Sequence, residues 1–195
     1  MEVSELMKHL RYLALPFVLF SQPLMAADFN GAMQTYLDSA IRSWVADPAL
    51  VLAITAANTD RAGYDQAKID ELDAAWKSEL GQAATPTITP VEMNAASEFL
   101  RTQVSASGGK ITEALLTDAH GLNVAVSAPT SDMWQGDEDK FTKVFPAGSM
   151  GTHFSDVELD ESTQSYQGQI SVSIIDPATQ SVIGTLTVGV NADAL

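Results

Sequence analysis

The residues best suited to bind another molecule lie close together between positions 131 and 140. This segment combines a flat indole ring, an amide, carboxylates and a cation, groups that stack on and hydrogen-bond to small charged ligands. They are Ser131, Asp132, Trp134, Gln135, Asp137 and Lys140. Loops held by a rigid scaffold often carry binding groups, so the pattern predicts a ligand-binding loop. The alternative is that Trp134 only closes the core beneath the loop.

The sequence lacks the patterns that predict catalysis. In Gly148-Ser149-Met150-Gly151 the serine stands one position too early for a nucleophile elbow, and no other Gly-x-Ser-x-Gly occurs. Phosphate-binding and dinucleotide-binding glycine loops are also missing. His120 falls in an expected turn, which favours a solvated residue, and His153 opens an expected strand, where a pocket role is the alternative. No nucleophile, base and orienting group can be assembled, so a hydrolase is the weakest hypothesis and we expect no enzyme.

Two acidic clusters, at 137–139 and 156–161, raise the question of a metal site. Calcium is the cation that such oxygen-rich clusters would bind outside the cell, but neither cluster has EF-hand spacing. The first cluster is more simply explained as the first turn of a helix, where carboxylates favour the positive end of the helix dipole. The second is explained as a solvated strand face and turn. We therefore expect no metal and no cofactor.

Composition limits the class of protein. The chain has 195 residues, no cysteine, 46% apolar residues and a formal net charge of -15, which fits one soluble domain with a core of its own. The excess of 25 Asp and Glu over 10 Lys and Arg excludes the basic surface that nucleic-acid binding needs. The lack of cysteine excludes thiol catalysis, thiolate metal sites and disulfides.

The first 27 residues have the order of a secretory signal peptide. Lys8 and Arg11 precede the apolar run 12–20, and small residues follow up to Ala26 and Ala27. The run is about half of the roughly 20 residues that a spanning helix needs. We therefore expect cleavage after Ala26 or Ala27 and a bacterial protein that is periplasmic or secreted, without direct membrane insertion after cleavage.

Residues 28–195 divide into a helical part, 28–105, and a sheet part, 110–195. Apolar spacing of three and four predicts helices over about 29–45, 48–58, 69–80 and 91–103, with Asp47-Pro48 starting the second and Gly81 ending the third. The stretch 85–90 cannot continue any helix, because it contains Pro86 and Pro90. Alternation then predicts a hairpin of 111–117 and 122–127 around Gly121, a helix over 137–144, and strands over 153–159, 165–175 and 181–190.

These features together resemble a single Cache domain, a PAS-like extracellular sensor domain of the PDC type. The resemblance rests on the helices with Trp44, Asn58 and Trp76, followed by LTDAHGLNVAVS at 116–127, WQGD at 134–137, VSIID at 172–176 and VIGTLTVGV at 182–190. It covers nearly all of 28–195. It implies an α+β fold in which long N-terminal helices pack against a five-stranded antiparallel sheet. It also implies a small-molecule pocket roofed by the loop between the hairpin and the third strand.

The resemblance implies a small-molecule ligand that is an amino acid, an amine or a small carboxylate. Carried over by position, the site draws on the loop residues above and on Tyr166 with either Gln169 or Ser171; Tyr166 and Gln169 face opposite sides, so at most one of them belongs. Lys140, Lys143 or His153 would pair with a carboxylate, and Asp132 or Asp137 with an amine.

Most Cache domains lie between two membrane helices of a receptor, kinase or cyclase, whereas this sequence shows no exit helix before Leu195. We therefore expect a sensor without its own transmembrane or output module. It would act through a membrane receptor or kinase as partner, or serve in scavenging or simple solute capture. The alternative is a structural or protein-interaction domain of the cell envelope that has no small-molecule ligand.

Overall fold

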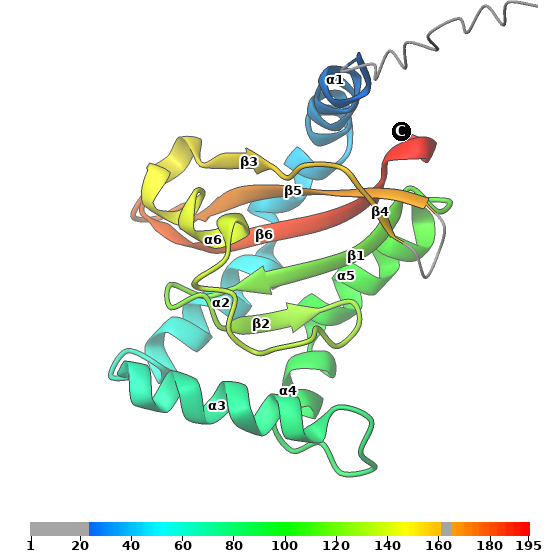
Figure 1. The fold of residues 1–195 in the computed structure, drawn as a ribbon. Coiled ribbons are helices and arrows are strands. Elements are labelled where there is room, and N and C mark those ends of the chain that lie inside the picture. Colours follow the sequence, from blue (N-terminus) through cyan, green and yellow to red (C-terminus); the bar gives the residue numbers. More distant parts are fainter. Residues whose placement is uncertain (1–23, 161–164) are drawn as a thin grey trace, which may run out of the picture.

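The computed structural model describes residues 24–160 and 165–195, which form helices packed against one antiparallel sheet (Figure 1). The α-helices are α1 (Leu24–Ser39), α2 (Pro48–Asp60), α3 (Gln66–Glu79), α4 (Ile88–Glu92), α5 (Ala95–Ala106) and α6 (Asp139–Thr142). The 3-10 helices are η1 (Ile41–Ala46), η2 (Phe145–Met150) and η3 (Ala192–Ala194). The strands are β1 (Ile111–Thr117), β2 (Asn123–Val126), β3 (Thr152–Phe154), β4 (Glu158–Asp160), β5 (Ser165–Ile175) and β6 (Val182–Asn191).

The sheet has five positions in the order β2-β1-β6-β5-β3, all antiparallel. The outer position beside β5 is shared by two short strands, because β3 pairs with Ile170–Val172 and β4 pairs with Ser165–Gln167. The α+β fold class, with a five-position antiparallel sheet and N-terminal helices, is confirmed. The long strands β5 and β6 lie at its centre and carry residues toward both faces.

One face of the sheet is apolar and is covered by helices. Figure 1 shows α2 and α5 behind the strands, with α1 rising from the side of β5. Alternate residues of β1, β5 and β6 are buried with side chains of α1, α2 and α5 in one cluster; its members include Met33, Leu37, Ile54, Leu100, Leu116, Ile170, Val172, Leu186 and Val188. Burial of apolar surface, at about 25 cal/mol per Å², is the main force that holds the helices on this face.

A second, smaller core joins α3 and α4 to the β2 edge. It contains Trp76, which is fully buried, together with Leu115, Leu122 and Met133. The indole N–H of Trp76 donates to the carbonyl oxygen of Thr130 at 2.8 Å, so the ring also fixes the segment that follows β2. This core explains why the Ile69-Leu72-Trp76 spacing was a reliable helix signal.

Several local predictions are confirmed. The carboxylate of Asp47 accepts the N–H of Ala49 at 2.8 Å and caps α2, whose first residue is Pro48. Gly121 has a φ of 78°, as the turn between β1 and β2 requires, and Gly81 follows α3 with a φ of 74°.

The helix predicted over 29–45 is interrupted. α1 ends at Ser39 and the tighter helix η1 begins at Ile41, after Ala40 leaves helical geometry. In a 3-10 helix residues three apart lie on the same side, and here this places both Ile41 and Trp44 in the main core. The apolar spacing was read correctly, but it does not distinguish one helix from two.

The stretch 85–90 does not continue α3, but α4 begins within it, at Ile88, three residues before the predicted start of the fourth helix at residue 91. Pro90 lies in the first turn, where a missing N–H costs no helical hydrogen bond. The carboxylate of Glu79 accepts the N–H groups of Thr87 and Ile88 at 2.8 and 3.0 Å, and so satisfies the start of the helix. The helix predicted over 91–103 divides at Asn94, whose side chain caps α5 by accepting the N–H of Ser97.

Two predicted elements of the sheet part are shorter than expected. The strand predicted over 153–159 divides into β3 and β4. The hydroxyl oxygen of Ser155 accepts the N–H of Gln169 at 2.8 Å, and regular pairing with β5 resumes only at Glu158. The helix predicted over 137–144 is limited to α6, and η2 follows it directly.

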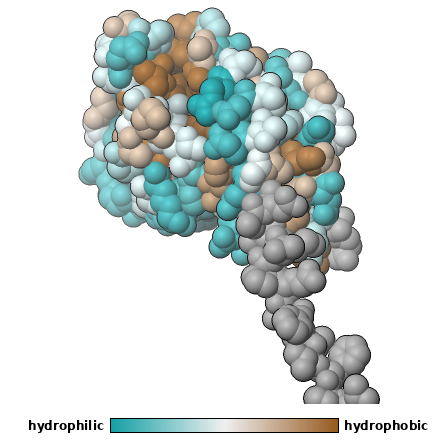
Figure 2. All heavy atoms as spheres, turned by 90° about the horizontal axis from the view of Figure 1, so that it is seen from above, coloured by the Kyte–Doolittle hydropathy of each residue, from teal (hydrophilic) through white to brown (hydrophobic). Residues whose placement is uncertain are grey.

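On the face seen from above, Figure 2 shows many hydrophilic residues, with hydrophobic residues in one large patch and a smaller one. Among the described residues the large apolar side chains that are exposed are Leu52, Leu80, Met93, Met150, Leu159 and Tyr166. No helix within the described ranges is long and apolar enough to cross a membrane. The predicted signal peptide falls largely on residues 1–23, outside the described residues, while α1 includes Ala26 and Ala27.

Candidate functional site

The face of the sheet opposite the main core is polar. Residues that alternate with the apolar ones bring serine and threonine together across strands: Ser171 and Thr187 are hydrogen-bonded at 2.9 Å, and Thr117 and Thr185 at 2.7 Å. All four are fully buried. The segment between β2 and β3, with α6 and η2, covers them. A buried hydroxyl without a partner is costly, and here each hydroxyl satisfies its neighbour.

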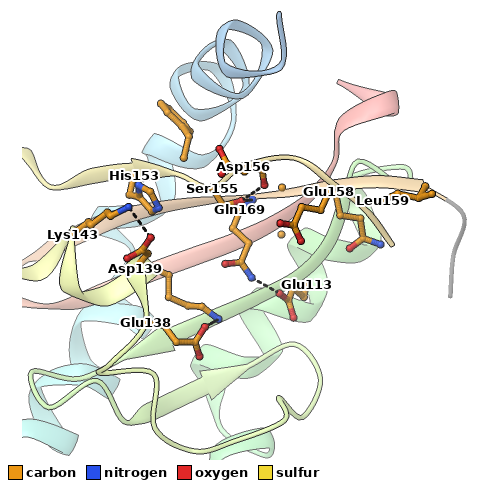
Figure 3. A pocket seen from close by; sticks show the side chains of 15 residues that line it. Glu113, Glu138, Asp139, Lys143, His153, Ser155, Asp156, Glu158, Leu159 and Gln169 are labelled. Carbon is orange, nitrogen blue, oxygen red and sulfur yellow. Dashed lines mark hydrogen bonds and ion pairs between the residues drawn. The ribbon is translucent and has the colours of Figure 1, made fainter. Parts of the chain in front are cut away.

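A cavity of about 500 Å³ opens at the end of this polar face, where α6, the β3–β4 segment and the central strands meet (Figure 3). Its volume lies within the range of small-molecule sites, roughly 300–1,000 Å³. The lining residues are Glu113, Glu138, Asp139, Lys140, Lys143, His153, Phe154, Ser155, Asp156, Glu158, Leu159, Gln167, Gly168, Gln169 and Gly189. Five carboxylates stand against two lysines, so the lining carries a net charge of -3 with His153 neutral.

The sheet wall of the cavity is built on one row of three residues. Glu113, Gly189 and Gln169 are partners across β1, β6 and β5. The amide of Gln169 donates to the carboxylate of Glu113 at 3.2 Å, and this bond passes over a residue without a side chain. A Cβ at Gly189 would lie 2.6 Å from the Cγ of Glu113, so glycine is what allows this carboxylate to lie across the strand.

The sheet wall is acidic. Figure 3 shows Glu113, Glu158 and Gln169 turned toward the middle of the cavity, with Asp156 above them. Among the residues that the structure describes, no Lys, Arg or His forms an ion pair with Glu113, Asp156 or Glu158. This side of the cavity therefore offers carboxylate oxygens to a cation from outside the chain.

The α6 wall carries both signs of charge. The ammonium of Lys140 lies 3.0 Å from the carboxylate of Glu138, and that of Lys143 lies 2.6 Å from Asp139. His153 stands beside this pair, on the side of the cavity away from Glu113. Burial and the neighbouring Lys143 cation lower the pKa of His153 below its ordinary value, against the opposing pull of Asp139 and Asp156, which favours the neutral ring.

The predicted site residues divide between the cavity and its support. Lys140 lines the cavity, as do Lys143, His153 and Gln169. Ser171 shares the face of Gln169 but is fully buried against Thr187. Ser131 and Asp137 are exposed and lie outside the lining. Tyr166 also lies outside it and stacks on Phe29 of α1, with ring centroids 6.3 Å apart.

Asp132, Trp134 and Gln135 support the α6 wall rather than line the cavity. The indole N–H of Trp134 donates to the carbonyl oxygen of His120 at 2.9 Å, which closes the loop onto the β1–β2 turn. Gln135 is buried and donates to the carboxylate of Asp132 at 2.6 Å. Trp134 is also partly buried against the second core. Its contacts therefore fit the alternative in which it closes the core beneath the loop, and the cavity lies beside that loop, beneath α6.

Sequence reasoning missed the acidic sheet wall. Glu113 is the one charged residue of β1, which was a signal. Its partner Gly189 is distant in sequence, and spacing alone could not join the two residues. Glu158 was seen only as part of a solvated acidic cluster. The described residues contain no group of three or more His, Asp or Glu side chains arranged to hold a metal ion.

No protein-family model and no curated protein matches the sequence. Similar solved structures are bacterial receptor domains. The sensor domain of the histidine kinase DctB of V. cholerae is 15% identical with a TM-score of 0.44, over 86% of this chain and 54% of that one. The ligand-binding domain of the Campylobacter jejuni chemoreceptor Tlp3, in complex with 4-methylisoleucine, is 12% identical with a TM-score of 0.40, over 85% of this chain and 60% of that one.

An extracellular ligand binding receptor from Desulfohalobium retbaense is 15% identical with a TM-score of 0.39, over 74% of this chain and 25% of that one. The chain thus spans at most 60% of these three structures. At such identities and TM-scores the likeness carries no argument about ligand or partner.

Proposed function

We propose that this protein is a periplasmic small-molecule-binding sensor domain whose ligand occupies the cavity beneath α6. The observation that carries the proposal is the cavity itself, placed on the polar face of the sheet and lined by charged groups with room for a ligand. Catalysis has no comparable support. The hydroxyl of Ser155 in the lining donates to the carbonyl oxygen of Asp156 and not to a base, and no other nucleophile in the described lining is held by a base.

The charges of the two walls favour a ligand that contains an amine. An ammonium group would meet Glu113 and Glu158, which have no cation of their own in the described structure, and would reduce the net charge of the lining. A ligand with two carboxylates would add two negative charges to a lining that already carries a net charge of -3. Of the three ligand classes considered, amino acids and amines therefore fit better than small carboxylates.

The proposed role includes a partner that responds to the bound ligand. A membrane receptor or kinase that recognises the ligand-bound form is the partner we propose. A structural or protein-interaction role is the second candidate, favoured by the closely bonded Trp134 loop. Under that role the cavity would stay empty at any ligand concentration.

Thermal unfolding of the purified protein tests the proposal. The panel contains amino acids, diamines, small dicarboxylates and calcium, each at millimolar concentration. A ligand at about 100 times its dissociation constant stabilises the folded state by roughly 2.7 kcal/mol, which is readily measured as a rise in the unfolding midpoint. We expect a rise with at least one amine-containing compound, and a smaller rise or none in Glu113→Gln. If no compound raises the midpoint, the interaction role replaces the sensor role.

A further inference from the structure

Lys140 occupies an unusual position among the charged groups of the cavity. Its side chain is only 12% exposed, whereas that of Lys143 on the same wall is 54% exposed. Its ammonium donates to the amide oxygen of Gln135 at 3.0 Å and lies 3.0 Å from the carboxylate of Glu138. An ammonium group has three N–H donors, so one remains for a group in the cavity that Lys140 lines.

The acceptor that holds Lys140 is itself fixed. Gln135 is 1% exposed, and its amide nitrogen donates to the carboxylate of Asp132 at 2.6 Å and to the carbonyl oxygen of the same residue at 3.1 Å. Because both bonds need an N–H donor, the amide nitrogen of Gln135 must face Asp132, and its amide oxygen then faces Lys140. The side chains of Asp132, Gln135 and Lys140 therefore form a directed chain of hydrogen bonds that ends at the cavity wall.

The backbone of this segment is equally constrained. The N–H of Gln135 donates to the carbonyl oxygen of Gly121 at 2.8 Å, while the N–H groups of Met133 and Trp134 donate to the carboxylate of Asp73 on α3 at 2.9 and 3.1 Å. The chain of hydrogen bonds thus starts from a segment fixed at both α3 and the β1–β2 turn. Such support sets the position of a binding group before the ligand arrives.

A neutral acceptor matters here because the cavity is rich in carboxylates. A lysine without a fixed acceptor would settle between carboxylates and lose its attraction for an anionic ligand group. Gln135 holds the ammonium through an uncharged oxygen, so it fixes the position of Lys140 without cancelling its charge. Glu138 neutralises part of the charge of Lys140. The third N–H of the ammonium group stays available to a ligand in the cavity.

We propose that Lys140 binds a carboxylate of the ligand and that Asp132 and Gln135 are positioning residues that set this selectivity. The inference rests on the proposed function and makes it more specific. With an ammonium group at Glu113 and Glu158 and a carboxylate at Lys140, the ligand is an amino acid rather than a simple amine. The ammonium group and the carboxylate of the ligand then contact different walls of the cavity.

Calorimetric titration with the twenty common amino acids and their C-terminal amides tests the inference. Each amide keeps the side chain and the α-ammonium group but lacks the α-carboxylate. The native protein should bind at least one amino acid ten times or more tightly than its amide. Lys140→Met and Gln135→Met should bring that ratio close to one while amide affinity stays within about threefold, because only the carboxylate contact is lost.

Two further variants separate positioning from folding. Asp132→Asn keeps an oxygen acceptor for Gln135 but removes the charge, and we expect an intermediate ratio of affinities. Lys68→Met removes an exposed lysine of α3 that pairs with Glu71 away from the cavity, and this matched control should keep the native ratio. A general loss of structure would weaken amino acid and amide together and would leave the ratio unchanged.

The outcomes distinguish the two proposals. If no amino acid, amine or carboxylate binds the native protein, the proposed function fails. If an amino acid and its amide bind equally, or Lys140→Met keeps the native ratio, the role of Lys140 is overturned while the sensor proposal stands. If Lys140→Met loses the preference but Gln135→Met and Asp132→Asn both retain it, the positioning role is overturned.

Discussion

The two faces of the same sheet differ in chemistry: one is apolar and the other is polar. On the helix side Ile170, Val172 and Ile174 of β5 are buried with apolar side chains of α1, α2 and α5. On the other side Gln169, Ser171 and Ser173 of the same strand contact polar groups. The first face is held by apolar burial and the second by paired hydrogen bonds that end at a cavity. Alternate residues of one strand therefore contribute to stability and to the proposed binding.

The largest expected effect comes from breaking the apolar face. Ile170→Ala should lower the free energy of unfolding by about 2–5 kcal/mol, because Ile170 is fully buried and the truncation leaves a cavity in the main core. Denaturant unfolding monitored by circular dichroism measures the loss. Ligand selectivity, measured as the ratio of affinities for two ligands, should stay unchanged. A changed ratio would mean that the two faces do not act separately.

A smaller effect is expected from one hydroxyl of the polar face. Ser171→Ala leaves the buried hydroxyl of Thr187 without its partner and should cost about 1–3 kcal/mol. Adding Thr187→Val removes the unpaired group and should recover much of that loss. Denaturant unfolding of the single and double variants gives both values. If the double variant loses as much unfolding free energy as the two single variants together, the two hydroxyls do not stabilise the fold as a pair.

Charge on the sheet wall should affect binding more than folding. Glu113→Gln keeps the shape of the side chain but removes the negative charge, so we expect affinity for an amine-containing ligand to fall about tenfold, or about 1.4 kcal/mol. Titration calorimetry measures the change, and Glu92→Gln, at a partly exposed residue of α4 outside the cavity, is the matched control. Equal affinities of the Glu113→Gln and native proteins would remove the acidic wall from the site.

The smallest expected effect concerns the support of the α6 wall at acid pH. Burial opposes ionisation of Asp73, but hydrogen bonds from Lys77 and from the N–H groups of Trp134 and Met133 outweigh it and hold the pKa of this carboxyl below 3.8. Because the folded-state pKa is the lower one, ionised Asp73 contributes stability above pH 3.8 that is lost as pH falls through the folded-state pKa.

Asp73→Asn removes that contribution. Between about pH 5 and about pH 3 this variant should lose less unfolding free energy than the native protein. Denaturant unfolding at several pH values gives the slopes, and Asp70→Asn on the same helix is the control. Identical slopes for the Asp73→Asn and native proteins would contradict the role assigned to these hydrogen bonds.

Much of the fold could be predicted from the sequence because its signals are local. The alternation in β5 gives its bounds, and the Asp47-Pro48 pair places the start of α2. The breaks at Ala40, Asn94 and Ser155 were missed, since each depends on contacts made in the folded chain. Asn94, for example, also donates to the carbonyl oxygen of Val124, far away in sequence.

The candidate site was predicted in part for the same reason. Lys140 belongs to a local cluster whose composition stood out, and the structure places it at the cavity. The roles of Asp132 and Gln135 as supports could not be read from spacing, because an amide that contacts a ligand and one that holds a lysine look alike in sequence. The row of Glu113, Gly189 and Gln169 needs the pairing of three strands, which no local pattern contains.

The central claim is that the polar face of the sheet, and not the helix face, binds the ligand. Amide chemical-shift mapping of the isotope-labelled protein, titrated with the compound that most raises its unfolding midpoint, tests this directly. We expect the largest shifts at Glu113, Lys140, Gln169 and Gly189, with little change along α2 and α5. Shifts concentrated instead in the groove between α1 and Leu195, or along α2 and α5, would contradict the account.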